Sequence, residues 1–322
     1  MMNDRRVVVI SGPTGVGKSA AALAAAECLA GEIINGDSLQ VYRGFDIGTA
    51  KPDKAERARV PHHLFDILDP DEPFNAPAFQ AAADRAIEGI LDRGRLPLVV
   101  GGTGLYLKTL LFGLCEMPAV DPALRAELED RLEREGAPAL HAELARRDPE
   151  MAARLAPRDR TRVLRALETV LATGKSIAWY QERHRFASPR YDFLHLYLEM
   201  ERAELYRRID LRVERMMEQG LVAEVEGLLA RGYDPGLKPF KSIGYRQVID
   251  YLAGRMSYDE AVADIQQATR RYAKRQLTWL RHDRFARAVP AEEAGRLVTM
   301  IGEFLASGLG PETGCNLAEE VT

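Results

Sequence analysis

The chain of 322 residues has few cysteines and no long apolar run. Its three cysteines, Cys28, Cys115 and Cys315, lie far apart and form no C-x-x-C pair, so they support neither a disulfide framework nor a structural zinc site. No apolar stretch approaches the roughly 20 residues that a membrane span needs. The apolar run behind the N-terminal Met-Met-Asn-Asp-Arg-Arg is too short for a secretion signal. We therefore expect a cytoplasmic protein with no membrane segment.

The sequence also lacks a strong excess of charge of one sign. Its formal net charge of −4 does not indicate a nucleic-acid-binding protein. Basic residues are nevertheless clustered: residues 146–165 contain seven arginines, and residues 270–287 contain seven basic side chains interleaved with Tyr272, Trp279 and Phe285. Most charge runs form solvated helix faces. Two such clusters in a chain of negative net charge favour a polyanionic ligand such as RNA.

The clearest motif is a phosphate-binding loop between an apolar strand and an Ala-rich helix pattern, and it fills the template G-x-x-x-x-G-K-[ST]. Backbone amides of such a loop surround phosphate oxygens, and the helix N-terminus adds its positive end. Lys18 can neutralise the terminal phosphate, and the Ser19 hydroxyl can hold Mg²⁺. A helix cap that binds nothing would not need all three parts in this order. The predicted phosphate-binding residues are Gly12, Pro13, Thr14, Gly15, Val16, Gly17, Lys18 and Ser19.

The acidic strand end with which P-loop triphosphate hydrolases help to hold their metal is missing. The clearest second strand pattern, residues 96–100, ends in Gly-Gly-Thr-Gly, and the pattern at 32–35 ends in Gly-Asp-Ser. Ligands of parallel sheets lie outside the carboxyl ends of the strands. We therefore expect the phosphate loop, Asp37 and Thr103 to converge on one cleft. Such a site suits the transfer of a group from a phosphorylated donor to a nucleophile.

Strand and helix patterns alternate over residues 5–113, which is typical of a doubly wound parallel sheet. From Asp121 to about Arg185 the pattern is helical, and the apolar run 193–198 indicates a strand that returns to the sheet. The predicted fold is α/β, a P-loop-containing doubly wound parallel sheet with a helical insertion domain of about 70 residues. The predicted domains are a discontinuous core of residues 1–120 and 190–306, an insertion at 121–189, and a disordered tail at 307–322.

Two further segments lead to structural expectations. Residues 52–69 lack clean periodicity and are interpreted as a loop over the cleft. Adjacent histidines rarely share one metal ion, so we expect His62 and His63 to form structural hydrogen bonds in that loop. Helices are predicted to resume from Glu201 to about Phe304.

One arginine lies on the apolar side of the helix that begins near Glu201. Leu205, Ile209, Arg212 and Met216 follow a 4-3-4 spacing, which places Arg212 on the apolar stripe. An arginine in such a position usually snorkels or forms a salt bridge. Because this stripe should face the sheet and its ligand edge, Arg212 is a candidate to meet the leaving phosphate.

Seven sequence blocks carry a resemblance to a known family. They are residues 12–19, 36–42, 46–52, 61–64, 101–106, 244–247 and 274–281. On these blocks the chain resembles bacterial tRNA dimethylallyltransferases, also called tRNA isopentenyltransferases, from Val7 to about Phe285. The resemblance implies that dimethylallyl diphosphate donates its prenyl group to N6 of the adenosine at tRNA position 37, beside the anticodon, and that diphosphate is released. The implied partners are dimethylallyl diphosphate and the tRNA anticodon stem-loop. The expected cofactor is Mg²⁺, on the phosphate-loop motif alone, and we expect a monomer.

The resemblance also assigns residue roles. Asp37 is the implied general base, because a carboxylate can orient the weakly nucleophilic N6 and take its proton. Thr103 and Arg212 contact the reacting ends of the two substrates. The implied tRNA-binding positions are Ser38, Leu39, Gln40, Thr103, Arg125, Thr161, Arg162, Val163, Leu164, Arg165, Lys241, Ser242, Ile243, Gly244, Tyr245 and Arg246.

Three alternatives stay open on the sequence. A small-molecule kinase with ATP as donor would use a similar loop and aspartate, but the arginine-rich insertion and the run at 274–281 argue against it. An isopentenyltransferase that acts on a free adenine nucleotide would have less use for the insertion. A P-loop switch or RNA-binding module without catalysis would leave Asp37 and Arg212 without a role.

Overall fold

The computed structural model describes residues 5–115, 117–118, 120–184 and 188–307. The chain divides into two compact units, one of Met1–Leu111 with Arg190–Thr322 and one of Phe112–Pro189. The sequence-based boundaries of the insertion were 121 and 189. The tail predicted to be disordered lies outside the described residues except for Ser307, which ends a helix. Among the described residues, no helix has the length and apolar character needed to cross a membrane.

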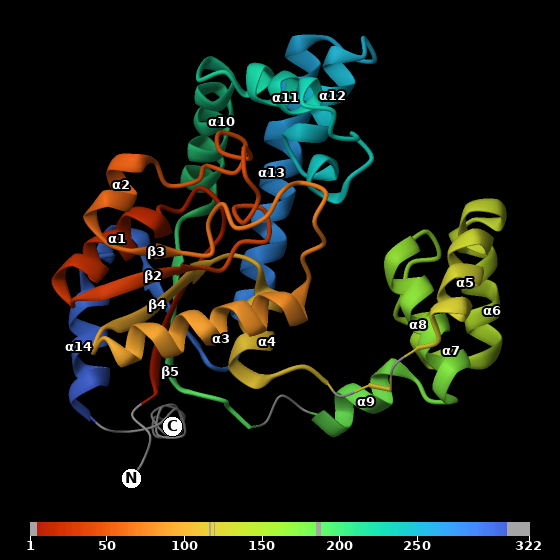
Figure 1. Ribbon diagram of the computed structural model, residues 1–322, viewed down its shortest axis with the longest axis horizontal. Helices are drawn as coiled ribbons and strands as arrows, with labels where there is room; N and C mark the ends of the chain where they lie inside the picture. Colours follow the sequence, from red (N-terminus) through yellow and green to blue (C-terminus); the bar gives the residue numbers. More distant parts are fainter. Residues whose placement is uncertain (1–4, 116, 119, 185–187, 308–322) are drawn as a thin grey trace. The chain divides into compact units, whose positions relative to one another are not determined.

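The first unit is built on a six-stranded parallel sheet of order β3-β2-β4-β1-β5-β6 (Figure 1). Its strands are β1 (Arg6–Ser11), β2 (Gly31–Asn35), β3 (His62–His63), β4 (Leu96–Gly101), β5 (Asp192–Glu199) and β6 (Ala286–Pro290). The predicted parallel sheet and the return of the chain to it as β5 are confirmed. The edge strand β6 corrects the prediction of helices from Glu201 to about Phe304. Val289 is its one buried residue, so its apolar pattern is weak.

Helices cover both faces of the sheet (Figure 1). The helices of this unit are α1 (Lys18–Cys28), α2 (Lys54–Arg59), α3 (Ala76–Asp92), α4 (Gly104–Phe112), α10 (Arg202–Glu218), α11 (Leu221–Ala230), α12 (Tyr245–Leu252), α13 (Tyr258–Arg281) and α14 (Arg296–Ser307), with short 3₁₀ turns at Lys238–Lys241 and Ala291–Glu293. Leu23 of α1 and Ile301 of α14 share a buried core with Ile10 and Leu98 of the strands. On the opposite face α3 packs against β2 and β4. Alternate strand residues therefore serve two cores, as a doubly wound sheet requires.

The segment predicted to be a loop over the cleft, residues 52–69, contains α2 and β3, so the predicted loop conformation was wrong. Its position at the cleft is confirmed, because Lys54, Arg57 and Asp66 line the pocket at the carboxyl ends of the strands. Asp53 caps α2 through a reciprocal pair of hydrogen bonds with Glu56, a helix-start signal present in the sequence. The structural interpretation of the two histidines is confirmed. The His62 Nδ1 atom lies 2.8 Å from the Val60 carbonyl oxygen, and the His63 Nε2 atom lies 2.7 Å from Glu32 Oε2. No group of three or more metal-binding side chains occurs in the part of the chain that is described.

The second unit consists of helices, as predicted. They are α5 (Pro122–Glu135), α6 (Ala137–Arg147), α7 (Pro149–Ala153), α8 (Arg160–Thr173) and α9 (Ile177–His184). Side chains of Asp121, Asp148 and Asp159 cap three of these helices by accepting backbone N–H bonds. Leu140, Leu144 and other buried apolar residues form a core of the unit's own. The unit therefore has the main features of an independent helical domain.

The chain leaves and re-enters the first unit at one place. The Arg190 amide donates a hydrogen bond to the Leu111 carbonyl at 2.8 Å. The Arg190 guanidinium donates to the Leu110 carbonyl at 2.9 Å and forms an ion pair with Asp84, which also accepts from the Tyr191 hydroxyl at 2.6 Å. These contacts join the two chain ends between which the second unit is inserted.

Candidate active site

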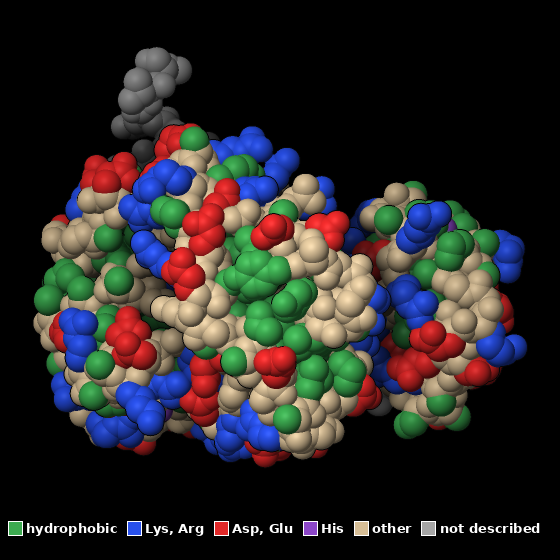
Figure 2. Space-filling view, turned by 90° about the horizontal axis from the view of Figure 1, so that it is seen from above, with side chains coloured by type: hydrophobic (Ala, Val, Ile, Leu, Met, Phe, Trp, Pro, Cys, Tyr) green, Lys and Arg blue, Asp and Glu red, His purple; other side chains and the backbone are tan. Residues whose placement is uncertain are grey.

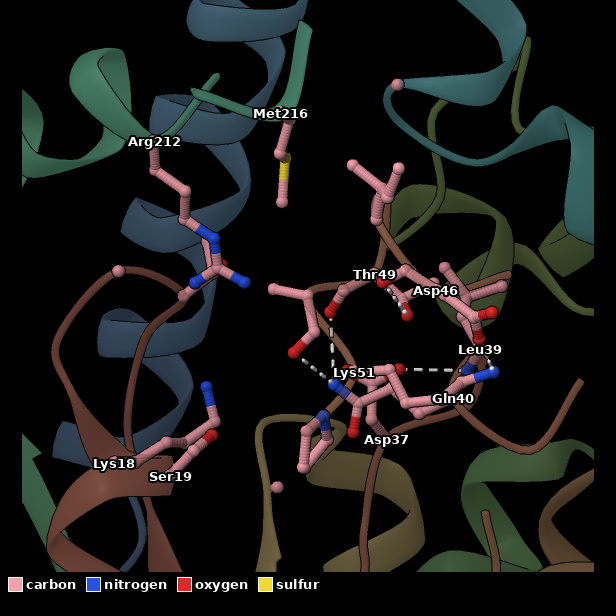
Figure 3. A pocket seen from close by; sticks show the side chains of 18 of the residues that line it. Lys18, Ser19, Asp37, Leu39, Gln40, Asp46, Thr49, Lys51, Arg212 and Met216 are labelled. Carbon is pink, nitrogen blue, oxygen red and sulfur yellow. Dashed lines mark hydrogen bonds and ion pairs between the residues drawn. The ribbon is translucent and has the colours of Figure 1, made fainter. Parts of the chain in front are cut away.

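A pocket with a volume of about 1980 Å³ lies at the carboxyl ends of the strands, and all its lining residues belong to the first unit. The lining includes Lys18 of the phosphate loop, Asp37 after β2, and Arg212 of α10 (Figure 3). The loop after β4 joins them, because the Ser38 amide donates a hydrogen bond to the Thr103 hydroxyl at 3.3 Å. The phosphate loop and Asp37 therefore share one pocket, as predicted, whereas Thr103 is not among the lining residues and is connected to them through Ser38.

The phosphate loop depends on glycine at two tightly packed positions. Gly12 has φ +151°, and a Cβ atom there would lie 2.9 Å from the Leu198 carbonyl oxygen. Gly15 has φ +85°, and a Cβ atom there would lie 3.0 Å from the Ile209 side chain. Both positions are strained for other residues. The loop is thus packed closely between β5 and α10.

Two cationic side chains face the same space. In Figure 3 the Arg212 guanidinium and the Lys18 ammonium point toward each other. Burial and the charge of Arg212 lower the pKa of Lys18 to about 8, and the Asp37 carboxylate opposes this shift. Burial also lowers the pKa of Arg212, again against the effect of Asp37. This pair of desolvated cations suits a ligand that brings several negative charges.

Asp37 is held by its own backbone surroundings. Its Oδ1 atom accepts a hydrogen bond from the Leu39 amide at 2.8 Å. Its backbone is fixed by the fully buried Asn35, whose Oδ1 accepts from the Asp37 amide at 2.8 Å and whose Nδ2 donates to the carbonyls of Asp37 and Leu64 at 3.0 Å. The sequence analysis missed Asn35, although a buried amide that ends a strand is a visible signal.

The position of Arg212 on its helix corrects one detail of the prediction. The buried stripe of α10 consists of Leu205, Ile209, Val213 and Met217, so it follows a spacing of four residues throughout. Arg212 lies beside that stripe and lines the pocket, as Met216 does (Figure 3). The Arg212 side chain therefore enters the pocket from a position next to the buried stripe of α10.

Helix α13 contributes pocket residues that were not predicted as such. Ile265, Thr269, Tyr272 and Gln276 follow a helical spacing and line the pocket together. Burial raises the pKa of Tyr272, the Asp37 carboxylate adds to the rise, and a hydrogen bond with Thr103 opposes it. Tyr272 was noted only as an aromatic in a basic cluster. Its place on the inner side of a long amphipathic helix is the signal that could have found it.

The loop at residues 46–51 forms another wall of the pocket (Figure 3). Glu224 of α11 accepts hydrogen bonds from the consecutive amides of residues 46–48, at 3.1, 2.7 and 3.2 Å. Gln40 donates to the carbonyls of Thr49 and Ala50 at 3.0 and 3.2 Å. Lys51, whose side chain is 1% exposed, pairs with two aspartates. This loop therefore connects α11 to the segment that follows Asp37.

The proposed tRNA-contact segments of the first unit differ in accessibility. Ser38, Leu39 and Gln40 line the pocket, as do Lys241, Ser242, Ile243 and Gly244. Arg246 is exposed. Tyr245 is fully buried, and its hydroxyl donates to Glu224 at 2.5 Å. This phenol therefore supports the loop at 46–48, and the assignment of residue 245 to a tRNA-contacting segment stays a prediction.

The corresponding residues of the second unit are mostly exposed. Arg125, Thr161 and Arg162 lie on its surface, and Leu164 and Arg165 are half-buried. The Val163 side chain is fully buried in the core of the unit, and the assignment of its segment to tRNA contact stays a prediction. On the face seen in Figure 2, basic and acidic side chains are interspersed over the described surface. Arginines of this unit accordingly form ion pairs, for example Arg162 with Asp159.

The model of the family described as IPP transferase matches residues 40–283. The chain belongs to this family. The match spans α10 to α13 and the loops on both sides of the pocket, so it includes Thr103, Arg212, Tyr272 and Gln276.

Individual relatives agree with this membership. The chain is 55% identical over 278 residues to the tRNA dimethylallyltransferase of Geobacter sulfurreducens, a match that covers 86% of this chain and 89% of that protein. Among solved structures, the tRNA isopentenylpyrophosphate transferase of Bacillus halodurans matches with a TM-score of 0.71 and 39% identity, over 94% of this chain and 97% of that one. A eukaryotic dimethylallyltransferase acting on tRNA matches with a TM-score of 0.81 and 28% identity, over 95% and 80% of the two chains.

Proposed function

We propose that this family member transfers the dimethylallyl group of dimethylallyl diphosphate to N6 of the adenosine at tRNA position 37, giving N6-(dimethylallyl)adenosine and diphosphate. The observation that carries the proposal is the arrangement at neighbouring strand ends. A glycine loop with two desolvated cations, Lys18 and Arg212, lies in the same pocket as the Asp37 carboxylate. The relatives named for this reaction support the same conclusion.

The chemistry follows from these groups. The adenine N6 atom attacks C1 of the prenyl chain while the bond from C1 to the diphosphate oxygen breaks. The electron pair of that bond leaves with the diphosphate, whose charge Lys18, Arg212 and the loop amides stabilise. Asp37 accepts the proton that N6 loses, since its backbone is held by Asn35 and its carboxylate by the Leu39 amide.

The Ser19 side chain fits the Mg²⁺ ion implied by the phosphate-loop motif. Ser19 lies in the first turn of α1, lines the pocket and offers a hard oxygen ligand. Magnesium is commonly held by few protein oxygens together with substrate phosphates and water. When bound, the ion would supply positive charge to the departing diphosphate. Ser19 would hold it beside the ammonium group of Lys18.

The proposed acceptor is an adenosine in the anticodon stem-loop. Extruding a base costs a few kcal/mol, least from a single-stranded loop, and contacts to neighbouring nucleotides offset this cost. The proposed contacts of the first unit are Ser38, Leu39, Gln40, Thr103 and residues 241–246, and those of the second unit are Arg125 and residues 161–165. A cytoplasmic monomer stays a prediction from the sequence.

A transfer assay tests the proposal. Purified protein is incubated with dimethylallyl diphosphate, Mg²⁺ and an unmodified tRNA that carries adenosine at position 37, and the digested tRNA is analysed by mass spectrometry. The expected product is prenylated adenosine at that position. Equal transfer to free AMP would favour the nucleotide-specific alternative, and consumption of ATP without prenyl transfer would favour a kinase.

A further inference from the structure

The side chain of Gln276 on α13 connects the two loops that serve the two substrates. Its Oε1 atom accepts a hydrogen bond from the Thr14 amide in the phosphate loop at 2.9 Å. Its Nε2 atom donates to the Gly102 carbonyl, one residue before Thr103, at 3.0 Å. The two loops follow the adjacent strands β1 and β4. One amide group thus bridges the donor side and the acceptor side of the pocket.

Close packing fixes this bridge. Gln276 is 7% exposed. A Cβ atom at Gly102 would lie 2.3 Å from the Gln276 Nε2 atom, so a larger residue cannot take this place without displacing the amide. Three residues further along α13, the Trp279 ring lies 2.6 Å from where a Cβ atom of Gly104 would be. Both contacts hold the loop after β4 against the same face of α13.

The hydrogen bonds also orient backbone groups of the site. The Thr14 amide points to Gln276, which fixes the start of the phosphate loop. The Gly102 carbonyl accepts the hydrogen bond from Gln276 Nε2, which fixes the peptide group between Gly102 and Thr103. Tyr272, one turn earlier on α13, interacts with the Thr103 side chain as well. Helix α13 therefore contacts both the phosphate loop and the loop after β4.

We propose that Gln276 is a positioning residue that sets the distance between the phosphate loop and the loop after β4, which carries Thr103. This inference rests on the proposed prenyl transfer. The residue touches neither substrate in this role. Because transfer needs the reacting atoms aligned at about 3–3.5 Å, a small displacement of one loop costs turnover more than binding.

Two variants test the proposal. Gln276→Met keeps the approximate shape and removes both hydrogen bonds, so we expect kcat on tRNA to fall by roughly 10- to 100-fold. The dissociation constants of dimethylallyl diphosphate and of tRNA should change less than about threefold. Gln267→Met, at an exposed position of the same helix, is the matched control and should behave as the parent.

Gln276→Glu supplies a readout that does not depend on the methionine variant folding well. An ionised carboxylate can accept from the Thr14 amide but repels the Gly102 carbonyl, whereas a protonated carboxyl group can accept and donate as the amide does. The ratio of its kcat to the parent's, taken at each pH, should therefore rise as the pH falls from 8 to 5.5. A flat ratio, or a methionine variant with parental kcat, would overturn the proposal. Absence of tRNA prenylation by the parent would instead refute the proposed function.

Discussion

At the scale of single residues, Asp37 is the group on which the reaction depends most directly. Asp37→Asn keeps the size of the side chain and removes its capacity to take a proton. We expect turnover to fall by at least roughly 100-fold, while tRNA binding stays near the parental value. Single-turnover transfer and a filter-binding titration measure the two quantities. Parental turnover in this variant would remove Asp37 from the role of general base.

Lys18 gives the site a pH dependence whose direction follows from its pKa. A free-enzyme pKa of about 8 means that the ammonium charge is present below this pH and is lost above it. Because the charged form binds diphosphate, kcat/KM for the donor should fall above about pH 8, by up to roughly tenfold for each pH unit. Lys18→Arg keeps its charge over this range, so its profile should lack that decline. A parental profile that is level from pH 7 to 10 would contradict the assignment.

Residue types in motifs were predictable from sequence, whereas residues that act through their neighbours were not. Lys18, Asp37 and Thr103 were found because each follows a strand in a recognisable pattern. Asn35, Tyr272 and Gln276 were missed, because their importance depends on which loops the folded chain brings within hydrogen-bond distance. Tyr245 and Val163, in contrast, were included in predicted tRNA-contacting segments although their side chains are buried. Their blocks resemble tRNA-contacting segments, but burial assigns these two side chains to support.

At the scale of elements, the contact between α11 and the loop at 46–51 supports the acceptor side of the pocket. Glu224→Gln leaves one acceptor oxygen for three amides and the Tyr245 hydroxyl, so we expect a stability loss of about 1–3 kcal/mol. The loosened loop should also lower kcat/KM for tRNA, because Gln40 is bound to its carbonyls. Urea unfolding and steady-state transfer assays measure the two effects. Glu226→Gln, an exposed neighbour on α11, is the matched control.

The elements that were mispredicted share a physical cause. Strand β6 is an edge strand with one buried side chain, so its sequence carries little of the apolar signal from which strands are predicted. Helix α2 has six residues and none of them is buried, so the capping pair Asp53 and Glu56 is its main signal. On α10 the true stripe and the predicted one differ by one residue from Val213 onward. Periodicity alone does not distinguish a buried position from one that borders a pocket.

At the scale of the whole molecule, the inserted unit is the proposed source of much of the affinity for tRNA. Arg162→Ala removes an exposed charge at a proposed contact, so binding should weaken and its salt dependence should become flatter by about one unit of log–log slope. Donor affinity should not change. Arg134→Ala, another exposed arginine of this unit, is the control. An unchanged slope for Arg162→Ala would count against this residue as a phosphate contact.

The hydrogen bond between the Arg190 amide and the Leu111 carbonyl makes the second unit separable in principle. A linker of a few flexible residues between Leu111 and Arg190 could replace the second unit, because these two residues are already hydrogen-bonded and Arg190 is held by an ion pair with Asp84. The remaining first unit would keep all the residues that line the catalytic pocket. Exchange of the module at that junction would then offer a way to redirect the same chemistry toward other nucleic-acid substrates.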